Sequence, residues 1–561
     1  MKKLFLLALG LMVPFVLFAQ SQSGKDWGYV TGSLESNNNI YVEDLSNNFR
    51  PSDYPQLGEG GIYATNNYLK VDYYKGRLSA GMQMEGYFPT IVGYPIAENN
   101  LSLSNLYASW RDKSWSVTAG TFYDQLGSGL LFRSWEDRML GLNNAMLGIR
   151  GTYNWEDKVS AKAFWGIPRL GKVADMAYVF GNKGSFFGFG LTGVHVAGGD
   201  VSVSLSNLID MGNVSLSVEG SVINKYEAAN EDLLAAGCKE NTIGWSGRFN
   251  FGMDGFFVKG EYVDAGNQIA NPGNVYFGQN AENGNAQLVE LGYNGNGLGV
   301  TFTGRRMSRM TQKIYNYTGD NMGFETTANL LSYRPAMSTQ YTYMLMTLNP
   351  YNPEIGAELN CAGEIGGQLD AFYNFRRGTK MGGKRGMKVH ANFATYYTLD
   401  AAGGTSDSEL LYRDFSLDVE KQWTKKFKTV LMYLMQEYHS ATSEFQAPIH
   451  VAVADLLYKW GPKLSTRLEL QYLATEDSKG DWMAGLLEVN FAPHWSVFAS
   501  DMWNHGSTKQ HYYNAGISFT MSHLRVAAGY GRYKAGYICS GGVCRRIPSY
   551  TGANITLTAS F

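Results

Sequence analysis

Apolar and polar residues alternate along many segments of the chain. The alternation is clearest near residues 411–423, where two interleaved sets of positions differ in character. The first set is Leu411, Arg413, Phe415, Leu417, Val419, Lys421 and Trp423, and the second is Tyr412, Asp414, Ser416, Asp418, Glu420 and Gln422. A period of two is the pattern of a β-strand. We expect the mostly apolar first set to face lipid and the polar second set to face a wet lumen.

Similar segments recur along the whole chain. Strands are predicted near 27–36, 62–74, 78–88, 102–111, 114–123, 144–155, 159–167, 214–225, 242–252, 255–265, 286–294, 298–306, 364–375, 387–397 and in the C-terminal third up to residue 561. We interpret segment 187–206 as one long, bulged strand, because a hairpin there would break the alternation of short and long connections. The total is about 24 strands, in a range of about 22–26.

The connections alternate in length. Short turns are predicted near 424–425, 461–464, 492–494 and 521–523, and longer polar loops near 398–409, 439–448, 476–481, 504–511 and 534–550. Outer-membrane barrels show this asymmetry, with short periplasmic turns and longer extracellular loops. We therefore assign the short turns to the periplasm and the long loops to the cell exterior.

The last strand has one apolar face, formed by Ile555, Leu557, Ala559 and Phe561. A closed barrel would remove the unpaired edge that such a strand presents in an open sheet. The alternative is the closing strand of a soluble sandwich. A final strand ending in Phe resembles the signal by which outer-membrane barrels are recognised, so Phe561 is the predicted signal to the barrel-assembly machinery. The prediction is an all-β fold, a transmembrane antiparallel up-and-down barrel in the outer-membrane bilayer.

Composition agrees with a barrel wall. The chain has 37 Tyr, 29 Phe and 66 Gly against 14 Pro, and only 17% of its residues are charged. Its mean hydropathy is nevertheless −0.23, as expected if half of each strand faces water. The formal net charge of −2 argues against nucleic acid as a partner.

The first residues read as an export signal. Lys2 and Lys3 precede an apolar run from Leu4 to Phe18, and the small residue Ala19 follows. We predict a signal peptide over residues 1–19 and a single barrel domain over 20–561. Such a protein is expected in the outer membrane of a Gram-negative cell.

Two connections are too long or too apolar for ordinary loops, and we expect them to fold inward and partly fill the lumen. The first, 124–143, also holds the candidate plug residues Arg133, Glu136, Asp137 and Arg138, spaced for an internal ion-pair cluster. The second is 307–362. The alternative for both is an external loop with a small apolar core of its own.

Four cysteines favour disulfides in an exported chain. Cys539 and Cys544 are separated by Ser-Gly-Gly-Val in a predicted external loop, and the glycines permit the sharp turn that a bond between them needs. Cys238 and Cys361 could form a second bridge if their strands approach each other. Zinc would need further ligands at suitable spacing, and none is present.

Two segments resemble a Bacteroidota outer-membrane barrel family of unknown function. They are Phe122–Gly129 continuing through Arg133–Asn143, and the closing hairpin from Cys539 to Phe561. The resemblance spans most of the predicted mature chain and implies location and fold. It brings no catalytic residues.

The sequence carries no recognisable nucleophile elbow, phosphate loop or zinc-protease motif, so we predict no enzyme, no metal and no cofactor. Two hypotheses remain. One is a structural or accessory barrel that works with other envelope proteins in transport, secretion or insertion. The other is a porin-like channel for small solutes. Charged residues of the predicted lumen wall would tune an open pore or pair across strands: Asp414, Asp418, Glu420, Arg467 and Glu469.

Overall fold

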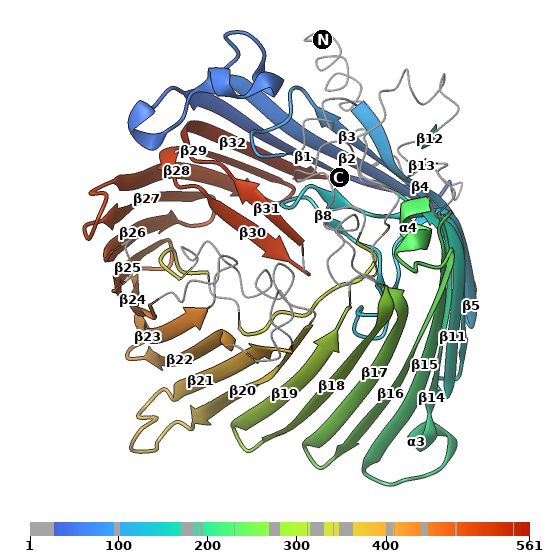
Figure 1. Ribbon diagram of the computed structural model, residues 1–561. Coiled ribbons are helices and arrows are strands. Elements are labelled where there is room, and N and C mark those ends of the chain that lie inside the picture. The colour runs from blue at the N-terminus through green and yellow to red at the C-terminus, as the bar shows by residue number, and fades with distance from the viewer. Residues whose placement is uncertain are drawn as a thin grey trace.

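Antiparallel strands form one closed barrel in the computed structural model (Figure 1). The structure describes residues 27–94, 101–169, 185–186, 189–190, 194–228, 231–268, 281–310, 312, 314, 330–339, 342–346, 363–399, 408, 410–438, 447–476, 480–541 and 543–561. Within these ranges the main sheet has 24 strands, as the alternation predicts. Residues 1–19, the predicted signal peptide, lie outside the described residues, and so does Cys361.

The barrel strands follow one another in chain order around the wall. They are β1 (Tyr29–Val42), β2 (Tyr63–Lys75), β3 (Leu78–Tyr87), β4 (Leu101–Arg111), β5 (Trp115–Phe122), β10 (Met146–Trp155), β11 (Val159–Pro168), β14 (His195–Ser204), β15 (Val214–Tyr226), β16 (Asn241–Met253), β17 (Phe256–Gln268), β18 (Glu282–Gly295), β19 (Leu298–Ser308), β20 (Gly363–Phe375), β21 (Met387–Thr398), β22 (Leu410–Gln422), β23 (Phe427–Tyr438), β24 (Ile449–Lys459), β25 (Leu464–Thr475), β26 (Trp482–Phe491), β27 (Trp495–Asn504), β28 (His511–Met521), β29 (Leu524–Tyr533) and β32 (Tyr550–Ser560).

Smaller elements lie in the connections. They are the short strands β6 (Gln125–Leu126), β7 (Phe132–Arg133), β8 (Glu136–Asp137), β9 (Leu142–Asn143), β12 (Ser185–Phe186), β13 (Phe189–Gly190), β30 (Gly536–Ser540) and β31 (Val543–Ile547), the 3-10 turns η1 (Leu45–Asn47), η2 (Pro51–Asp53) and η3 (Pro55–Leu57), and the helices α3 (Leu205–Leu208) and α4 (Glu231–Ala235). In the described part of the chain, no helix is long and apolar enough to cross a bilayer.

The last strand closes the barrel on the first. β32 pairs antiparallel with β1 from Ser33 opposite Ser560 to Val42 opposite Thr551. The sheet therefore has no free edge, which is the physical advantage of closure. The expectation drawn from the alternating final strand is confirmed.

The two ends of the barrel differ as expected. One end, here called the short-turn end, carries tight connections such as 76–77, 254–255 and 296–297, together with the start of β1 and the end of β32. The opposite, long-loop end carries the connections 43–62, 123–145 and 309–362.

Side chains alternate between the outside and the lumen along the wall. On β25, Leu470 is 50% exposed on the outer face, whereas its neighbours Glu469 and Gln471 are buried inside. On β22, Leu417 faces outward and Ser416 is buried. An apolar exterior on a closed barrel is the surface that a bilayer requires.

Two predictions of detail are wrong. Leu411 does not face lipid, because the register between β21 and β22 shifts beside it and the side chain is buried with Met337 and Tyr412. Segment 187–206 is not one bulged strand. The barrel strand β14 begins at His195 and pairs with both neighbours without a register shift, while β13 pairs with β12 in a separate hairpin.

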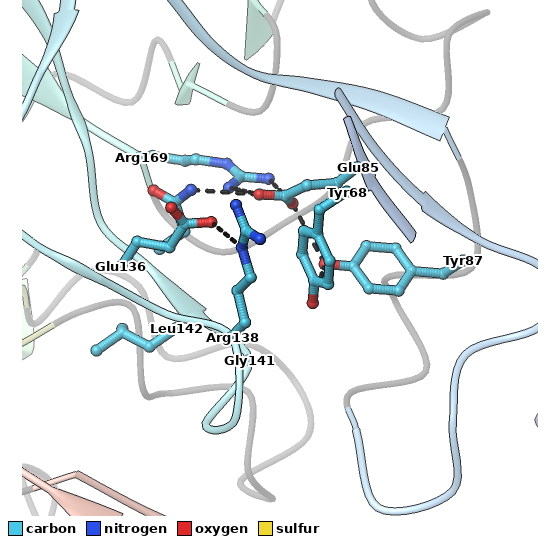
Figure 2. Close-up of a pocket in the computed structure, with 9 residues that line it drawn as sticks. Tyr68, Glu85, Tyr87, Glu136, Arg138, Gly141, Leu142 and Arg169 are labelled. Carbon is cyan, nitrogen blue, oxygen red and sulfur yellow. Dashed lines mark hydrogen bonds and ion pairs between the residues drawn. The ribbon is translucent and has the colours of Figure 1, made fainter. Parts of the chain in front are cut away.

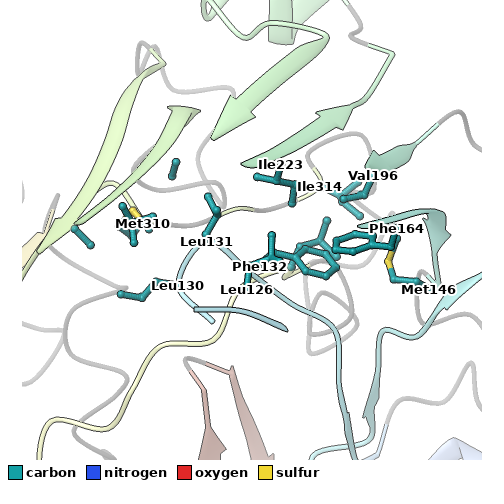
Figure 3. Close-up of a cluster of buried hydrophobic side chains, with 14 of the residues drawn as sticks. Leu126, Leu130, Leu131, Phe132, Met146, Phe164, Val196, Ile223, Met310 and Ile314 are labelled. Atoms are coloured by element: carbon teal, nitrogen blue, oxygen red, sulfur yellow. The ribbon is translucent and has the colours of Figure 1, made fainter. Parts of the chain in front are cut away.

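The first of the two unusual connections folds into the lumen, and so do the described residues of the second. Leu130, Leu131 and Phe132 of the first are fully buried in an apolar cluster with inward side chains of the wall (Figure 3). That wall set is Phe122, Met146, Phe164, Val196, Ile223, Val263, Ala265, Ala286 and Met307. In the second connection, Leu345 and Met346 pack on Met432, Leu434 and Val451. We call residues 123–145 the first plug loop and the described residues of 309–362 the second plug loop.

Candidate functional site: the junction of plug and wall

The hairpin β8–β9 presents a charged turn of the first plug loop to the barrel wall. The carboxylate of Asp137 accepts hydrogen bonds from the backbone N–H groups of Met139 (2.9 Å) and Leu140 (3.1 Å), which fixes the turn. Gly141 completes it with a φ of +71°, a conformation that favours glycine. The local sequence thus sets the position of Arg138, the residue that reaches the wall.

Arg138 joins the plug to strands β1 and β3, and Figure 2 shows its contact with Glu136 of the plug. Its guanidinium lies 2.7 Å from the Glu35 carboxylate and 3.2 Å from that of Glu136. It also donates to the Gln83 side chain at 3.3 Å and lies 4.4 Å from the centre of the Tyr68 ring. Burial disfavours the charged guanidinium and by itself would lower the pKa of Arg138. The carboxylates of Glu136 and Glu35 have the larger effect, so the pKa of Arg138 is raised above its ordinary value.

A second, fully buried ion pair stands beside the first. Arg169, just beyond β11, contacts the Glu85 carboxylate of β3 at 3.0 Å, and both side chains are under 5% exposed. Asn143 of the plug loop donates to the same carboxylate at 3.2 Å and accepts from the Tyr123 hydroxyl at 3.1 Å. Although burial opposes the charged form of Arg169, the Glu85 carboxylate raises the pKa of Arg169 overall.

The space left at this junction is small. The cavity between Tyr68, Glu85, Glu136, Arg138 and Arg169 measures about 10 Å³, which is about the room that one water molecule needs. An organic ligand does not fit. The charged groups are already engaged with one another, so the arrangement suits holding the plug in place rather than binding a solute.

Further anchors tie the first plug loop to strands β10, β11 and β17. The buried carboxylate of Asp124 lies 2.5 Å from Arg150 of β10 and 2.7 Å from Lys162 of β11. The backbone N–H of Ser128 donates to Glu261 of β17 at 3.1 Å. The loop is therefore held by polar contacts at both ends and by apolar packing between them.

The second plug loop has its own anchors. The Ser338 hydroxyl donates to the buried carboxylate of Asp414 on β22 at 2.5 Å. The backbone N–H of Leu345 donates to the side chain of Gln471 on β25 at 2.8 Å. This loop also touches the first, since Tyr333 donates its N–H to the carbonyl of Gly129 at 2.9 Å.

A third segment joins them. The hairpin β30–β31 leaves the wall and lies over the lumen (Figure 1). Arg545 donates to the carbonyl of Met139 at 2.9 Å and stacks 3.8 Å from the ring centre of Tyr94, while Gly541 accepts from the Arg334 N–H at 3.0 Å. The predicted external loop at 534–550 is thus part of the plug assembly. Cys539 and Cys544 are direct cross-strand partners in it.

The four predicted plug residues have different partners in the structure. Glu136 and Arg138 pair, but Asp137 caps its turn and Arg133 stacks 4.0 Å from the ring centre of Tyr333. The partners of the plug at this junction were not predicted: the wall residues Glu35, Tyr68, Gln83, Glu85 and Tyr87, and Arg169 just beyond β11. They come from segments remote in sequence, and no local pattern marks them.

The predicted lumen charges mostly pair across strands. Arg467 contacts Asp455 at 2.9 Å and Glu469 at 2.6 Å, and Glu420 contacts Lys428 at 2.8 Å. Asp418 lies 2.6 Å from His390, which contacts Asp370 on its other side. No group of three or more metal-ligating side chains suited to an ion occurs among the described residues.

Comparison with known proteins identifies a family. A family model described as "Family of unknown function (DUF6029)" matches residues 1–561. No curated protein sequence matches the chain.

Among solved structures, three barrels illustrate the similarity. The siderophore receptor PirA from Pseudomonas aeruginosa matches with a TM-score of 0.41 and 10% identity over 96% of this chain and 82% of that one. The P pilus usher PapC translocation pore matches with a TM-score of 0.43 and 8% identity, over 95% of this chain and 99% of that one. A mutant of the Rh. blastica porin matches with a TM-score of 0.25 and 12% identity, over 62% of this chain and 100% of that one. These similarities assign no role.

Proposed function

This chain belongs to the DUF6029 family of unknown function, and we propose that it is an outer-membrane barrel whose own loops obstruct its lumen, acting as a structural or accessory barrel in a larger envelope assembly. The assembly would serve transport, secretion or protein insertion. The protein would be exported by its signal peptide, inserted by the barrel-assembly machinery and held in the lipid bilayer. Other envelope proteins would be its partners.

The observation that carries this proposal is the buried anchoring of the first plug loop. Asp124 binds two cations of the wall, and Arg138 binds Glu35 on another part of the wall. Removing one member of a buried ion pair typically costs about 3–5 kcal/mol, because the other charge is left unpaired. This cost applies to the buried Asp124 carboxylate, while the partly exposed Arg138–Glu35 pair adds less. Together with the large apolar cluster, these contacts hold the loop in the lumen.

The charged groups at the junction support the same proposal. A solute channel uses the charges of its constriction on the solute. Here the charged groups pair with one another instead: Arg138 with Glu35, and Arg169 with Glu85. The cavity that remains between them measures about 10 Å³.

Planar-bilayer recording of the purified protein tests the proposal. We expect the native protein to show no steady conductance. A variant in which residues 126–142 are replaced by a short Gly-Ser linker is the positive control, and it should conduct steadily. Both proteins should first show the heat-modifiable mobility of a folded barrel on gels.

The second arm of the test is partner recovery. Chemical crosslinking in the native membrane, followed by purification under mild detergent, should recover stoichiometric envelope proteins. A steady open pore in the native protein, with no crosslinked partner, would favour the porin-like channel and overturn the proposal.

A further inference from the structure

Three neighbouring connections at the short-turn end carry cations and no carboxylate. They join β20 to β21 (376–386), β22 to β23 (423–426) and β24 to β25 (460–463), and we call them the basic sector. Their charged residues are Arg376, Arg377, Lys380, Lys384, Arg385, Lys425, Lys426 and Lys463. Arg385 is half-buried, and the other seven side chains are exposed.

Other connections at the same end are different. Between β4 and β5, Asp112 pairs with Arg77 of the adjacent turn at 2.7 Å. Between β10 and β11, Lys158 pairs with Glu156 at 2.6 Å. Arg77 and Lys158 of these other turns are paired with carboxylates. Positive charge not offset by a carboxylate at this end is therefore concentrated on one side of the barrel, in the basic sector.

The longest of the three connections is folded back against the outer face of the wall. Within it, the Thr379 hydroxyl donates to the carbonyl of Arg376 at 2.7 Å and accepts from the Gly382 N–H at 2.9 Å. The ammonium group of Lys421 donates to the carbonyls of Met381 (3.0 Å) and Gly382 (2.7 Å). Lys421 shares the outward parity of Leu417, so this turn lies on the lipid side of the barrel.

Tryptophans mark the level of the bilayer surface at the same place. Trp423 and Trp460 are 57% and 58% exposed and begin the two other connections of the sector. The Trp423 indole donates to Thr429, and the Trp460 indole donates to Thr466, at 2.9 and 3.0 Å. Exposed Trp at barrel ends sits at the lipid headgroups. Lys425, Lys426 and Lys463 follow within three residues, at the depth of the phosphates.

We propose that the basic sector binds the phosphate groups of anionic phospholipids in the leaflet at the short-turn end. Eight cations without a carboxylate attract anionic lipid, and Lys and Arg near a membrane surface each contribute to such binding. The outward fold of the turn at 376–386 and the flanking Trp residues favour lipid over an acidic protein approaching from the aqueous side. The sector would hold a local annulus of anionic lipid on one side of the barrel.

The test uses the purified full chain in neutral detergent, titrated with phosphatidylglycerol or phosphatidylcholine, with bound lipids counted by native mass spectrometry. The variant Lys380→Gln/Lys384→Gln/Arg385→Gln removes three cations from the sector. The matched control Arg77→Gln/Lys113→Gln/Lys158→Gln removes three from the same end, on the other side of the barrel. Heat-modifiable mobility confirms that all three proteins are folded.

We expect the parent and the control to retain phosphatidylglycerol in preference to phosphatidylcholine, and the sector variant to lose about tenfold or more of that preference. Equal retention by the sector variant and the parent would overturn the proposal. A second result would also overturn it: the sector variant loses binding to a polyglutamate peptide while its lipid retention is unchanged. The partner would then be an acidic polypeptide. The readout is independent of conductance, so failure here leaves the proposed function standing.

Discussion

The ring of Phe561 lies over Gly32. The two residues exchange backbone hydrogen bonds of 2.8 and 2.9 Å, which extend the pairing of the last strand with the first by one further step. A Cβ atom on Gly32 would stand 2.3 Å from the ring of Phe561. The first strand therefore has glycine at the point where the last strand's aromatic residue crosses it.

The first prediction follows from this contact. Gly32→Val should displace the Phe561 ring, and Phe561→Asp should remove it and place a charge at the seam. Both should lower the yield of heat-modifiable barrel in the outer membrane. Gly461→Val, where an added Cβ would meet no atom within 4 Å, is the control for the generic effect of replacing glycine by valine. Normal assembly of Phe561→Asp would refute the role of Phe561 as an assembly signal.

The second prediction concerns the outer face. Leu470→Arg should cost about 2–4 kcal/mol of unfolding free energy if the site lies near the bilayer midplane. Ser500→Arg, on a lumen-facing position of β27, should be mild. Reversible unfolding in lipid vesicles measures both, and similar costs at the two positions would contradict the assigned faces. Gln471 is unsuitable as the control, because its side chain accepts a hydrogen bond from the second plug loop.

The barrel was predictable from sequence because a period of two recurs through most of the wall, whatever the partner of each strand. Leu411 was misassigned because a one-residue register shift beside it changes which face of the strand its side chain occupies. Such a shift leaves no mark in the local composition. Apolar side chains such as Leu130 and Phe132 indicated that the first plug loop is buried. The partners of Arg138 were not predictable, since Glu35 and Gln83 lie 103 and 55 residues away in the chain.

The third prediction tests the anchoring of the first plug loop. Asp124→Asn leaves Arg150 and Lys162 without their shared carboxylate and should cost about 3–5 kcal/mol of local stability. Hydrogen exchange of the amides at 126–142 should then accelerate by at least tenfold, with the wall strands unchanged. Asp112→Asn, which breaks an exposed ion pair with Arg77, is the matched control and should have little effect. Unchanged exchange in Asp124→Asn would mean that the apolar cluster alone holds the loop.

The last prediction concerns the thiols. Cys539 and Cys544 face each other directly across the hairpin β30–β31, whose turn includes Gly541 at a φ of +63°. Direct partners in an antiparallel pair have Cα atoms about 4.5–5.5 Å apart, within the range of about 4.4–6.8 Å that a disulfide spans. The second predicted pairing, of Cys238 with Cys361, stays a prediction, because Cys361 lies outside the described residues. Cys238 itself has a free thiol in the structure.

Peptide mapping of unreduced protein from the outer membrane should find Cys539 linked to Cys544. Cys238 serves as the internal reference for a free thiol. Burial raises the pKa of Cys238, and Glu227 adds to the effect while Lys225 opposes it, so its alkylation should be slow at neutral pH and faster at higher pH. Rapid alkylation of Cys539 and Cys544 without reductant would refute the bond. Because Gly541 of the same hairpin accepts a hydrogen bond from Arg334 of the second plug loop, reduction should also increase amide exchange at 330–339.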